Sequence, residues 1–467
     1  MIQNAIRLRK PARLALLLAL VIGSISLLSA APLTYYKLSK EGPLPIGGDV
    51  YDFKLSANGL YTVYRAGQDV SEVAQLYAAR NDVGQPPEKL SALPRSGQRI
   101  NEYDISPNNA HVVYTADQDT RDLIELYSAR LDGSGAPVKL SGPMVEDGGL
   151  TMYSGGFKIS PDGSRVVYRA EQETVGVNEL YSVPVGGSAA PVKLNAPLPA
   201  GGSTNSYDIS PDSQYVVYTA DQDTDNVNEL YRAPLDGSGP PVKLSGPLVA
   251  GGGVIYFKFS PDSAWVIFLA DKDTDNVNEL YAVPLDGSLA PVKLNGPLAT
   301  GGNVAFAGNF FISPDSTRVI YIADQDTYNV DELYSVPIAG GTVTKLNPPL
   351  VPGGEVDWVS EPQISPDSSR VVYLADQETN DLEEIFSVPI AGGASVKLNG
   401  TLAGNYLYDF AISPDSSRVV YRARQDSATQ YELYSVPLAG GTTTKLNGFL
   451  SSGGQVNSFQ ILSLIHI

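Results

Sequence analysis

The chain has 467 residues, with 45 glycines, 34 prolines and no cysteine, and its formal net charge is −19. The absence of cysteine excludes a disulfide framework, a lipid-modified cysteine and a cysteine nucleophile. A strongly acidic chain disfavours nucleic acid and anionic membrane surfaces as partners. It suits cations, basic partners or neutral glycans, although acidity also simply keeps an exported protein soluble.

Residues 1–31 differ from the rest of the chain. Arg7, Arg9, Lys10 and Arg13 precede an apolar run over 14–28, and the segment ends on Ser29, Ala30 and Ala31. A basic start, an apolar stretch and a small-residue end predict a secretory signal peptide. An uncleaved N-terminal membrane anchor is the alternative. We therefore expect an exported protein, periplasmic or at the cell surface, that touches a membrane only through this segment.

A unit of about fifty residues then recurs eight times, and a ninth copy begins. Residues 207–245 are typical: four short apolar runs are separated by a Ser-Pro-Asp turn, an acidic loop and an Asp-Gly-Ser-Gly turn. Proline and glycine at turns, with β-branched and aromatic residues between them, predict strands. The turns after the first strand begin at eight serines: Ser56, Ser106, Ser160, Ser210, Ser260, Ser313, Ser365 and Ser413.

One four-stranded sheet cannot bury both of its faces alone, and stacking copies around an axis covers them. We therefore predict an all-β fold, a β-propeller over 34–461 with four-stranded antiparallel blades. Eight blades are expected, with seven as the alternative. Residues 34–39 read as an isolated fourth strand before the first unit, and propellers often close with such a strand. Residues 462–467 resemble translated adapter sequence, so we expect the natural protein to continue.

The run of Ser-Pro-Asp, Val-Val-Tyr, Glu-Leu-Tyr, a glycine hairpin and Lys-Leu resembles the TolB-like propeller repeat, which is related to WD-type propellers. The resemblance covers residues 34–461 and implies an exported bacterial propeller. Such propellers serve as periplasmic or surface scaffolds, as domains attached to peptidases, and as lyases. The resemblance is specific for the fold and says little about function.

In an antiparallel meander, the loop between strands two and three and the link between blades emerge on one face. Both are long here, and long loops on a rigid scaffold often bind partners. The first loop repeats an Asp-Gln-Asp-Thr pattern. We predict partner-binding acids on this face: Asp117, Asp119, Asp221, Asp223, Asp271, Asp273, Asp324 and Asp326. The simpler interpretation is that these side chains bond loop backbone and fix the turn.

Two copies of the loop carry a third acid, and carboxylates at alternate positions can bind Ca²⁺. The weak calcium candidates are Asp221, Asp223, Asp225, Asp271, Asp273 and Asp275. The glycine and terminal glutamate of the helical calcium loop are missing, so we expect no cofactor unless these acids bind Ca²⁺.

Two further positions recur. A glutamate precedes the third strand (Glu229, for example), and we expect a structural hydrogen bond or a pair with a neighbouring blade. On the innermost strand, Lys54, Asp104, Lys158, Asp208 and Lys258 alternate in charge, which predicts ion pairs between adjacent blades. A ligand site in the central channel is the alternative.

No catalytic constellation is found: there is no nucleophile elbow and no histidine pair for zinc. We therefore predict a monomeric, non-catalytic scaffold that binds a protein or glycan through the acidic long-loop face. The alternative is the propeller of a peptidase or hydrolase whose catalytic domain lies beyond residue 467.

Overall fold

The computed structural model describes residues 49–69, 73–92, 98–151, 156–305, 310–357, 359–404 and 407–462. The expected signal segment 1–31, the isolated strand 34–39 and the tail from residue 463 lie outside these ranges. The described residues form thirty-two strands, β1 to β32, and no helix. Accordingly, no helix in the described part of the chain is long and apolar enough to cross a membrane.

The strands form eight four-stranded sheets, each built from four consecutive antiparallel strands. We number them sheet 1 (β1–β4) to sheet 8 (β29–β32) in chain order. The first strands are β1 (Val50–Leu55), β5 (Ile100–Ile105), β9 (Phe157–Ile159), β13 (Thr204–Ile209), β17 (Val254–Phe259), β21 (Phe310–Ile312), β25 (Gln363–Ile364) and β29 (Leu407–Ile412). The second strands are β2 (Tyr61–Ala66), β6 (His111–Ala116), β10 (Arg165–Ala170), β14 (Tyr215–Ala220), β18 (Trp265–Ala270), β22 (Arg318–Ala323), β26 (Arg370–Ala375) and β30 (Arg418–Ala423).

The third and fourth strands are equally regular. The third strands are β3 (Gln75–Arg80), β7 (Glu125–Arg130), β11 (Glu179–Pro184), β15 (Glu229–Pro234), β19 (Glu279–Pro284), β23 (Glu332–Pro337), β27 (Glu384–Pro389) and β31 (Glu432–Pro437). The fourth strands are β4 (Glu88–Lys89), β8 (Val138–Lys139), β12 (Val192–Lys193), β16 (Val242–Lys243), β20 (Val292–Lys293), β24 (Thr344–Lys345), β28 (Val396–Lys397) and β32 (Thr444–Lys445).

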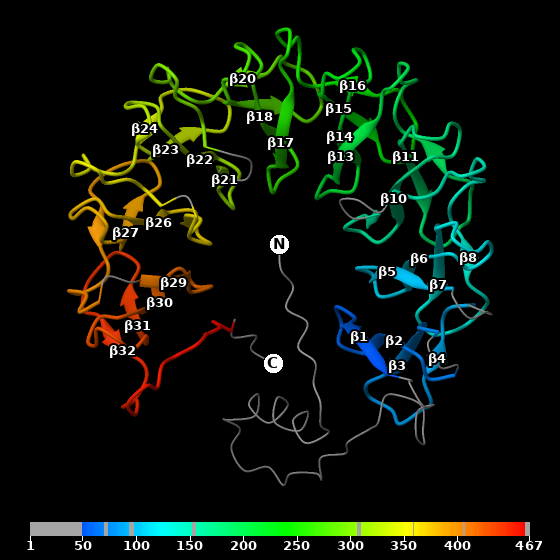
Figure 1. Cartoon of the computed structure of the whole chain (residues 1–467), viewed down its shortest axis with the longest axis horizontal. Coiled ribbons are helices and arrows are strands. Elements are labelled where there is room, and N and C mark those ends of the chain that lie inside the picture. Colours follow the sequence, from blue (N-terminus) through cyan, green and yellow to red (C-terminus); the bar gives the residue numbers. More distant parts are fainter. Residues whose placement is uncertain are drawn as a thin grey trace.

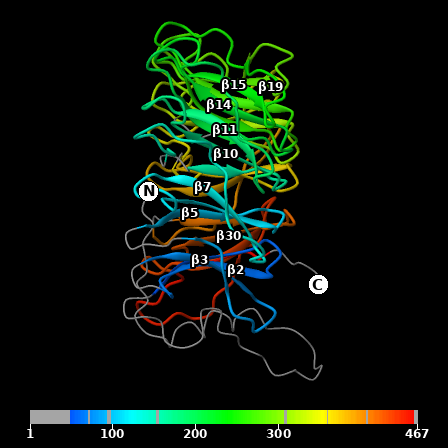
Figure 2. The same ribbon diagram turned by 90° about the vertical axis from the view of Figure 1, so that its right-hand side faces the viewer.

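The sheets are arranged around a central axis, with first strands such as β17 nearest the axis and fourth strands such as β20 at the rim (Figure 1). The predicted all-β propeller with eight four-stranded blades is confirmed, and the seven-blade alternative is wrong. In the side view the strands run across the thickness of the ring, so their ends lie on its two faces (Figure 2).

The core lies between successive sheets. Val216 and Tyr218 of β14 pack with Val167 and Leu180 of sheet 3, whereas Val217 belongs to the next cluster, toward sheet 5. Successive side chains of a strand point to opposite faces, and here both faces meet another sheet. This explains why the second strands are continuous apolar runs rather than alternating ones.

The Ser-Pro-Asp turns form one face of the ring, the turn face. Ser160 Oγ donates to Asp162 Oδ1 at 2.6 Å, and the N–H of Asp162 donates to Ser213 Oγ in the next unit at 3.1 Å. The same cross-unit bond joins four further pairs of turns, from sheets 4 and 5 to sheets 7 and 8. The turn face is therefore a nearly uniform belt of hydrogen bonds. The opposite face carries the longer connections, and we call it the loop face.

Candidate functional site

The first acid of each repeated loop bonds to backbone. Asp271 Oδ1 accepts the N–H of Gly253 at 2.6 Å, and its Oδ2 accepts the N–H of Asn276 at 3.2 Å. Both bonds recur at four more acids: Asp117, Asp221, Asp324 and Asp376. This carboxylate fixes its own loop and joins it to the link between sheets, as the simpler interpretation of the sequence expected.

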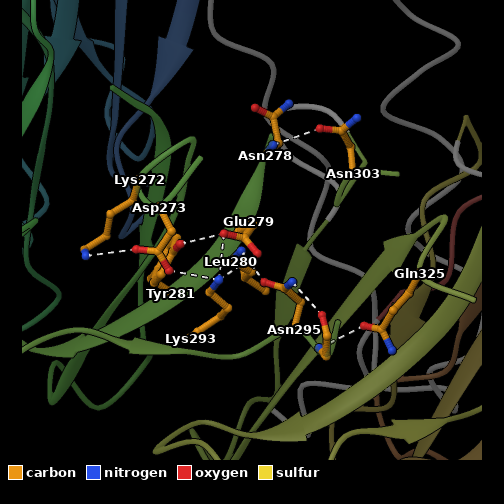
Figure 3. Close-up of polar contacts among 11 residues, drawn as sticks. Lys272, Asp273, Asn278, Glu279, Leu280, Tyr281, Lys293, Asn295, Asn303 and Gln325 are labelled. Atoms are coloured by element: carbon orange, nitrogen blue, oxygen red, sulfur yellow. Dashed lines mark hydrogen bonds and ion pairs between the residues drawn. The ribbon is translucent and has the colours of Figure 1, made fainter. Parts of the chain in front are cut away.

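The second acid pairs with a lysine of the fourth strand. In sheet 5, Lys293 Nζ lies 2.9 Å from Asp273 Oδ2 and 2.7 Å from Glu279 Oε1 (Figure 3). The Tyr281 hydroxyl donates to Glu279 Oε2 at 2.9 Å. The expected structural role of this repeated glutamate is confirmed. The expected pair with a neighbouring blade is wrong, because the lysine belongs to the same sheet.

These contacts shift the pKa values in the network. Burial, and then the charge of Glu279, raise the pKa of the Tyr281 hydroxyl. Burial alone would lower the pKa of Lys293, but its bonds to Glu279 and Asp273 outweigh burial and raise it. The bond from Lys293 holds the pKa of Asp273 below its usual value. At neutral pH Asp273 is therefore ionised, Lys293 is protonated and Tyr281 is neutral.

The glutamine between the two acids joins neighbouring sheets. Gln325 Oε1 of sheet 6 accepts the Tyr321 hydroxyl at 2.9 Å and the N–H of Gly296, just after β20 of sheet 5, at 2.9 Å. Figure 3 shows this contact beside the Asn295 side chain, whose Oδ1 accepts the N–H of Leu280 at 2.8 Å. The two acids and the glutamine of the repeated loop thus have partners within the scaffold.

The loop face also carries positions whose residue differs from one unit to the next. The residue before the third-strand glutamate is Ile124, Asn178, Asn228, Asn278, Asp331, Glu383 or Tyr431 in sheets 2 to 8. The start of the first strand varies in the same way. Because a residue that recurs in every unit serves the unit, the varying positions on the loop face are the better candidates for a specific site.

In sheets 3 to 5 the varying positions form a hollow of about 440 Å³. We call it the neutral hollow and define it by these residues: Thr151, Asn178, Ser203, Asn205, Ser206, Thr219 and Asn228. The side chains bond in pairs: Thr151 Oγ1 donates to Asn178 Oδ1, Asn205 Nδ2 donates to Asn228 Oδ1, and Ser206 Oγ lies 2.8 Å from Thr219 Oγ1. Amide and hydroxyl groups of sheets 3 and 4 therefore meet in one place, beside Val254 and Ile255 of sheet 5.

The wall of the hollow is held by Arg169. Its Nη1 donates to the carbonyl oxygen of Thr204 at 3.0 Å and to that of Asn205. The guanidinium is 6% exposed, and burial lowers its pKa. It carries the one charged side chain that lines the hollow within the described residues. The first strand of sheet 4 is thereby anchored to sheet 3.

The neighbouring part of the loop face is acidic. Asp331, Glu355, Asp357 and Glu383 of sheets 6 and 7 form what we call the acidic sector. Burial, followed by the charges of Glu355 and Asp324, raises the pKa of Asp331 to about 6. Burial and the neighbouring carboxylates also raise the pKa of Glu355 and of Glu383. One face of the ring thus carries a neutral part beside a part with crowded negative charge.

The eight predicted partner-binding acids divide into two sets. The first acids accept bonds from backbone N–H groups; Asp117 and Asp221 are buried, and Asp271 and Asp324 are partly buried. The second acids, Asp119, Asp223, Asp273 and Asp326, have side chains 44–53% exposed and lie beside a lysine. Their role in partner binding stays a prediction, and the second set is the more exposed of the two.

The calcium candidates of one loop point to different partners. Asp221 accepts backbone N–H groups, Asp223 pairs with Lys243, and Asp225 Oδ2 accepts Asn226 Nδ2 at 2.8 Å. Asp271, Asp273 and Asp275 repeat this arrangement. Within the described ranges, no three or more histidine, cysteine, aspartate or glutamate residues are grouped so that they could hold a metal ion.

The predicted ion pairs near the axis are present between two pairs of sheets. Lys54 Nζ lies 3.0 Å from Asp104 Oδ1, and Lys158 Nζ lies 2.7 Å from Asp208 Oδ1. These pairs are not buried: their side chains are 39–56% exposed, so each pair contributes about 0–1 kcal/mol. Lys258 instead donates to the carbonyl oxygen of Phe310 at 2.8 Å.

None of the residues of the neutral hollow was predicted from the sequence. The signal available in the sequence was the residue before each third-strand glutamate. This residue is isoleucine, asparagine, aspartate, glutamate or tyrosine in different units. It shows which positions escape the repeat, but not that residues from three units meet.

No family model matches the chain, and no curated protein matches it either. Among solved structures, a eukaryotic initiation factor has 13% identity and a TM-score of 0.49, with 88% of this chain and 90% of that one covered. A putative TolB from Agrobacterium tumefaciens has 20% identity and a TM-score of 0.29, covering 52% and 79%. Porphyromonas gingivalis dipeptidyl peptidase 4 has 12% identity and a TM-score of 0.49, covering 82% and 57%.

Proposed function

We propose that this chain is a non-catalytic binding scaffold, exported to the periplasm or the cell surface, whose loop face takes a protein or glycan partner. Export rests on the signal pattern of residues 1–31, and binding on the loop face rests on the geometry above. The proposal needs no cofactor. Of the two partner classes, the arrangement favours a neutral glycan.

The neutral hollow is the observation that carries this proposal. Asparagine amides both donate and accept hydrogen bonds, as serine and threonine hydroxyls do, and this matches the alternating donors and acceptors of sugar hydroxyls. The paired side chains hold one another in place before any ligand arrives, so little conformational entropy is lost on binding. A concave site with a few convergent polar groups is the usual form of a ligand site.

The exposed acids fit the same conclusion. Lys243 neutralises much of the charge of Asp223, and Lys293 does so for Asp273. An acid already paired with a lysine attracts a basic partner only weakly, because the partner must compete with that lysine. The repeated acids therefore offer less to a basic protein than the amides and hydroxyls of the neutral hollow offer to a sugar.

Binding of the full chain to an array of neutral hexose and N-acetylhexosamine oligosaccharides tests the proposal. The double variant Asn205→Ala/Asn228→Ala removes two amides of the hollow and is expected to weaken binding about tenfold or more. Asn278→Ala is the matched control, because Asn278 occupies the same place as Asn228 one sheet further on and does not line the hollow. Equal binding by the double variant, or no binding of any neutral glycan by the unaltered chain, would contradict the proposal.

A further inference from the structure

The face of sheet 8 that points away from sheet 7 is uncovered. Leu446 follows β32 and is 50% exposed, whereas the same leucine is 1–2% exposed in the seven preceding sheets: Leu90, Leu140, Leu194, Leu244, Leu294, Leu346 and Leu398. Val420 is partly exposed, although its counterpart Val372 is fully buried. Phe449 is 97% exposed. An apolar surface that is core in every other unit meets solvent here.

The innermost strand of sheet 1 shows the complementary exposure. Phe53 is 63% exposed, whereas its counterparts are 1–8% exposed: Tyr103, Phe157, Tyr207, Phe257, Phe310 and Phe410. Leu55 is 60% exposed. Seven apolar clusters join each sheet to the next, from sheet 1 through sheet 8. Among the described residues, no such cluster joins sheet 8 to sheet 1.

A glycine on the loop face gives independent evidence. A Cβ built on Gly296 or Gly400 would meet the glutamine of the following sheet, Gln325 or Gln425. The same construction on Gly448 of sheet 8 meets nothing within 4 Å. The glutamine that a following unit supplies elsewhere has no counterpart beside Gly448 in the described part of the chain.

The chain beyond sheet 8 nevertheless follows the path of a next first strand. The N–H of Val456 donates to the carbonyl oxygen of Tyr431 at 2.9 Å, as that of Val254 does to Asn228 at 2.7 Å. Arg422 Nη1 donates to the carbonyl oxygens of Val456 and Asn457. Arg65 of sheet 1 makes the same two bonds to the first strand of sheet 2. Residues 456 and 457 thus take the position that begins a ninth sheet.

We propose that the edge between sheet 8 and sheet 1 is a docking surface for a β-hairpin with the pattern of the second and third strands of this chain's own repeat. Such a hairpin pairs with the segment that begins at Val456. Its chemistry follows from sheet 4, where Val216, Tyr218 and Tyr231 pack on Leu194 and its neighbours. The hairpin must present β-branched and tyrosine side chains to Val420 and Leu446, and a glutamine to Gly448.

A fusion tests this proposal without the entropy loss of bimolecular binding. Residues 462–467 of the full chain are replaced by a copy of residues 210–234, which carries one such hairpin. The control fusion carries serine substitutions at the positions copied from Val216 and Tyr218. We expect the unaltered hairpin to raise the melting temperature by several degrees over the control, and to reduce the binding of an apolar dye at least twofold. Equal melting temperature and dye binding in the two fusions would overturn the proposal.

Two substitutions in the unaltered fusion locate the contact. Leu446→Ser is expected to abolish the gain in melting temperature, whereas Leu289→Ser is the matched control, because Leu289 is 65% exposed and lies in a turn-face connection of sheet 5. Sedimentation of the chain without the fusion tests a second copy as the occupant. A stable dimer that Leu446→Ser dissociates would replace the hairpin by a second copy and overturn the proposal.

Discussion

The two faces of the ring are built on different principles. On the turn face, the same serine and aspartate recur in nearly every unit, and each turn bonds to the next. On the loop face, an equally regular layer of acid, glutamine and lysine lies beneath positions that change from Asn228 to Asp331 to Tyr431. The comparison teaches that residues repeated in every unit build the scaffold. A specific surface is found where residues vary between units, and this occurs on the loop face only.

The largest expected effect tests the regular layer of the loop face. Glu229 is 4% exposed, accepts the Tyr231 hydroxyl and pairs with Lys243. Glu229→Ala leaves a buried hydroxyl and a lysine without this partner, so we expect a loss of about 3 kcal/mol in the free energy of unfolding. The control is Asp223→Ala, whose side chain is 53% exposed and which should cost less than about 1 kcal/mol. Denaturant unfolding measures both, and similar losses would mean that the two acids do not belong to different layers.

A second prediction concerns the crowded charge of the acidic sector. Because the pKa of Asp331 is raised to about 6, the folded state binds its proton more tightly than the unfolded state does. Stability therefore falls as the pH rises from about 4 to about 6, and it stays lower above that window. Asp331→Asn introduces the residue that sheets 3 to 5 carry at this position, and we expect it to stabilise the protein by about 1–2 kcal/mol at pH 7, discounted for its partial exposure.

The pH dependence of stability also distinguishes the turn face from the loop face. Burial alone would raise the pKa of Asp162 on the turn face, but the bonds from Ser160 and Ser164 lower it overall. Its contribution is present above about pH 4 and is lost on further acidification, which is the opposite sign to Asp331. Melting temperatures between pH 3 and pH 8 check this. The gain from Asp331→Asn should disappear below about pH 4, and a gain independent of pH would contradict the explanation by charge.

The smallest effect is expected on the turn face. Ser213 adopts a φ of 60°, a conformation that costs energy for a residue with a Cβ, and its Oγ accepts the N–H of Asp162. Ser213→Ala loses the acceptor but keeps the strain, so we expect a loss of about 1 kcal/mol. Ser213→Gly also loses the acceptor but relieves the strain, and it should lie within about 0.5 kcal/mol of the unaltered protein. Thermal unfolding distinguishes them, and equal losses would show that the strain does not matter.

Much of the fold could be predicted from the sequence because every unit repeats the same pattern of strands and turns. The Ser-Pro-Asp turn fixed the register, and the second strand, Tyr215–Ala220, follows it as expected. The first strand begins at Thr204, before the repeat unit that starts at residue 207 in the sequence, and its register is irregular between Thr204 and Tyr207. Asn205 and Ser206 break the apolar alternation because they face the hollow rather than a neighbouring sheet.

The site was less accessible than the fold. Asn178, Asn205 and Asn228 are ordinary polar residues in their own units, and their proximity depends on how sheets 3 and 4 are placed around the axis. The acids were predicted as partner-binding residues because they recur, yet the first acid of each loop accepts hydrogen bonds from backbone N–H groups. A repeated sequence pattern identifies the residues that stabilise one unit. It does not identify a site that residues of several units form together.

The contact from Gln325 to Gly296 joins sheet 6 to sheet 5, and the same contact joins three further pairs of successive sheets. Head and tail of one unit are therefore mutually complementary, and a tandem duplication of about fifty codons inserts a sheet without any compensating substitution. Duplication or deletion of one repeat can in this way add or remove one sheet at a time. Each step would change the angular separation between the neutral hollow and the acidic sector while leaving both chemically intact.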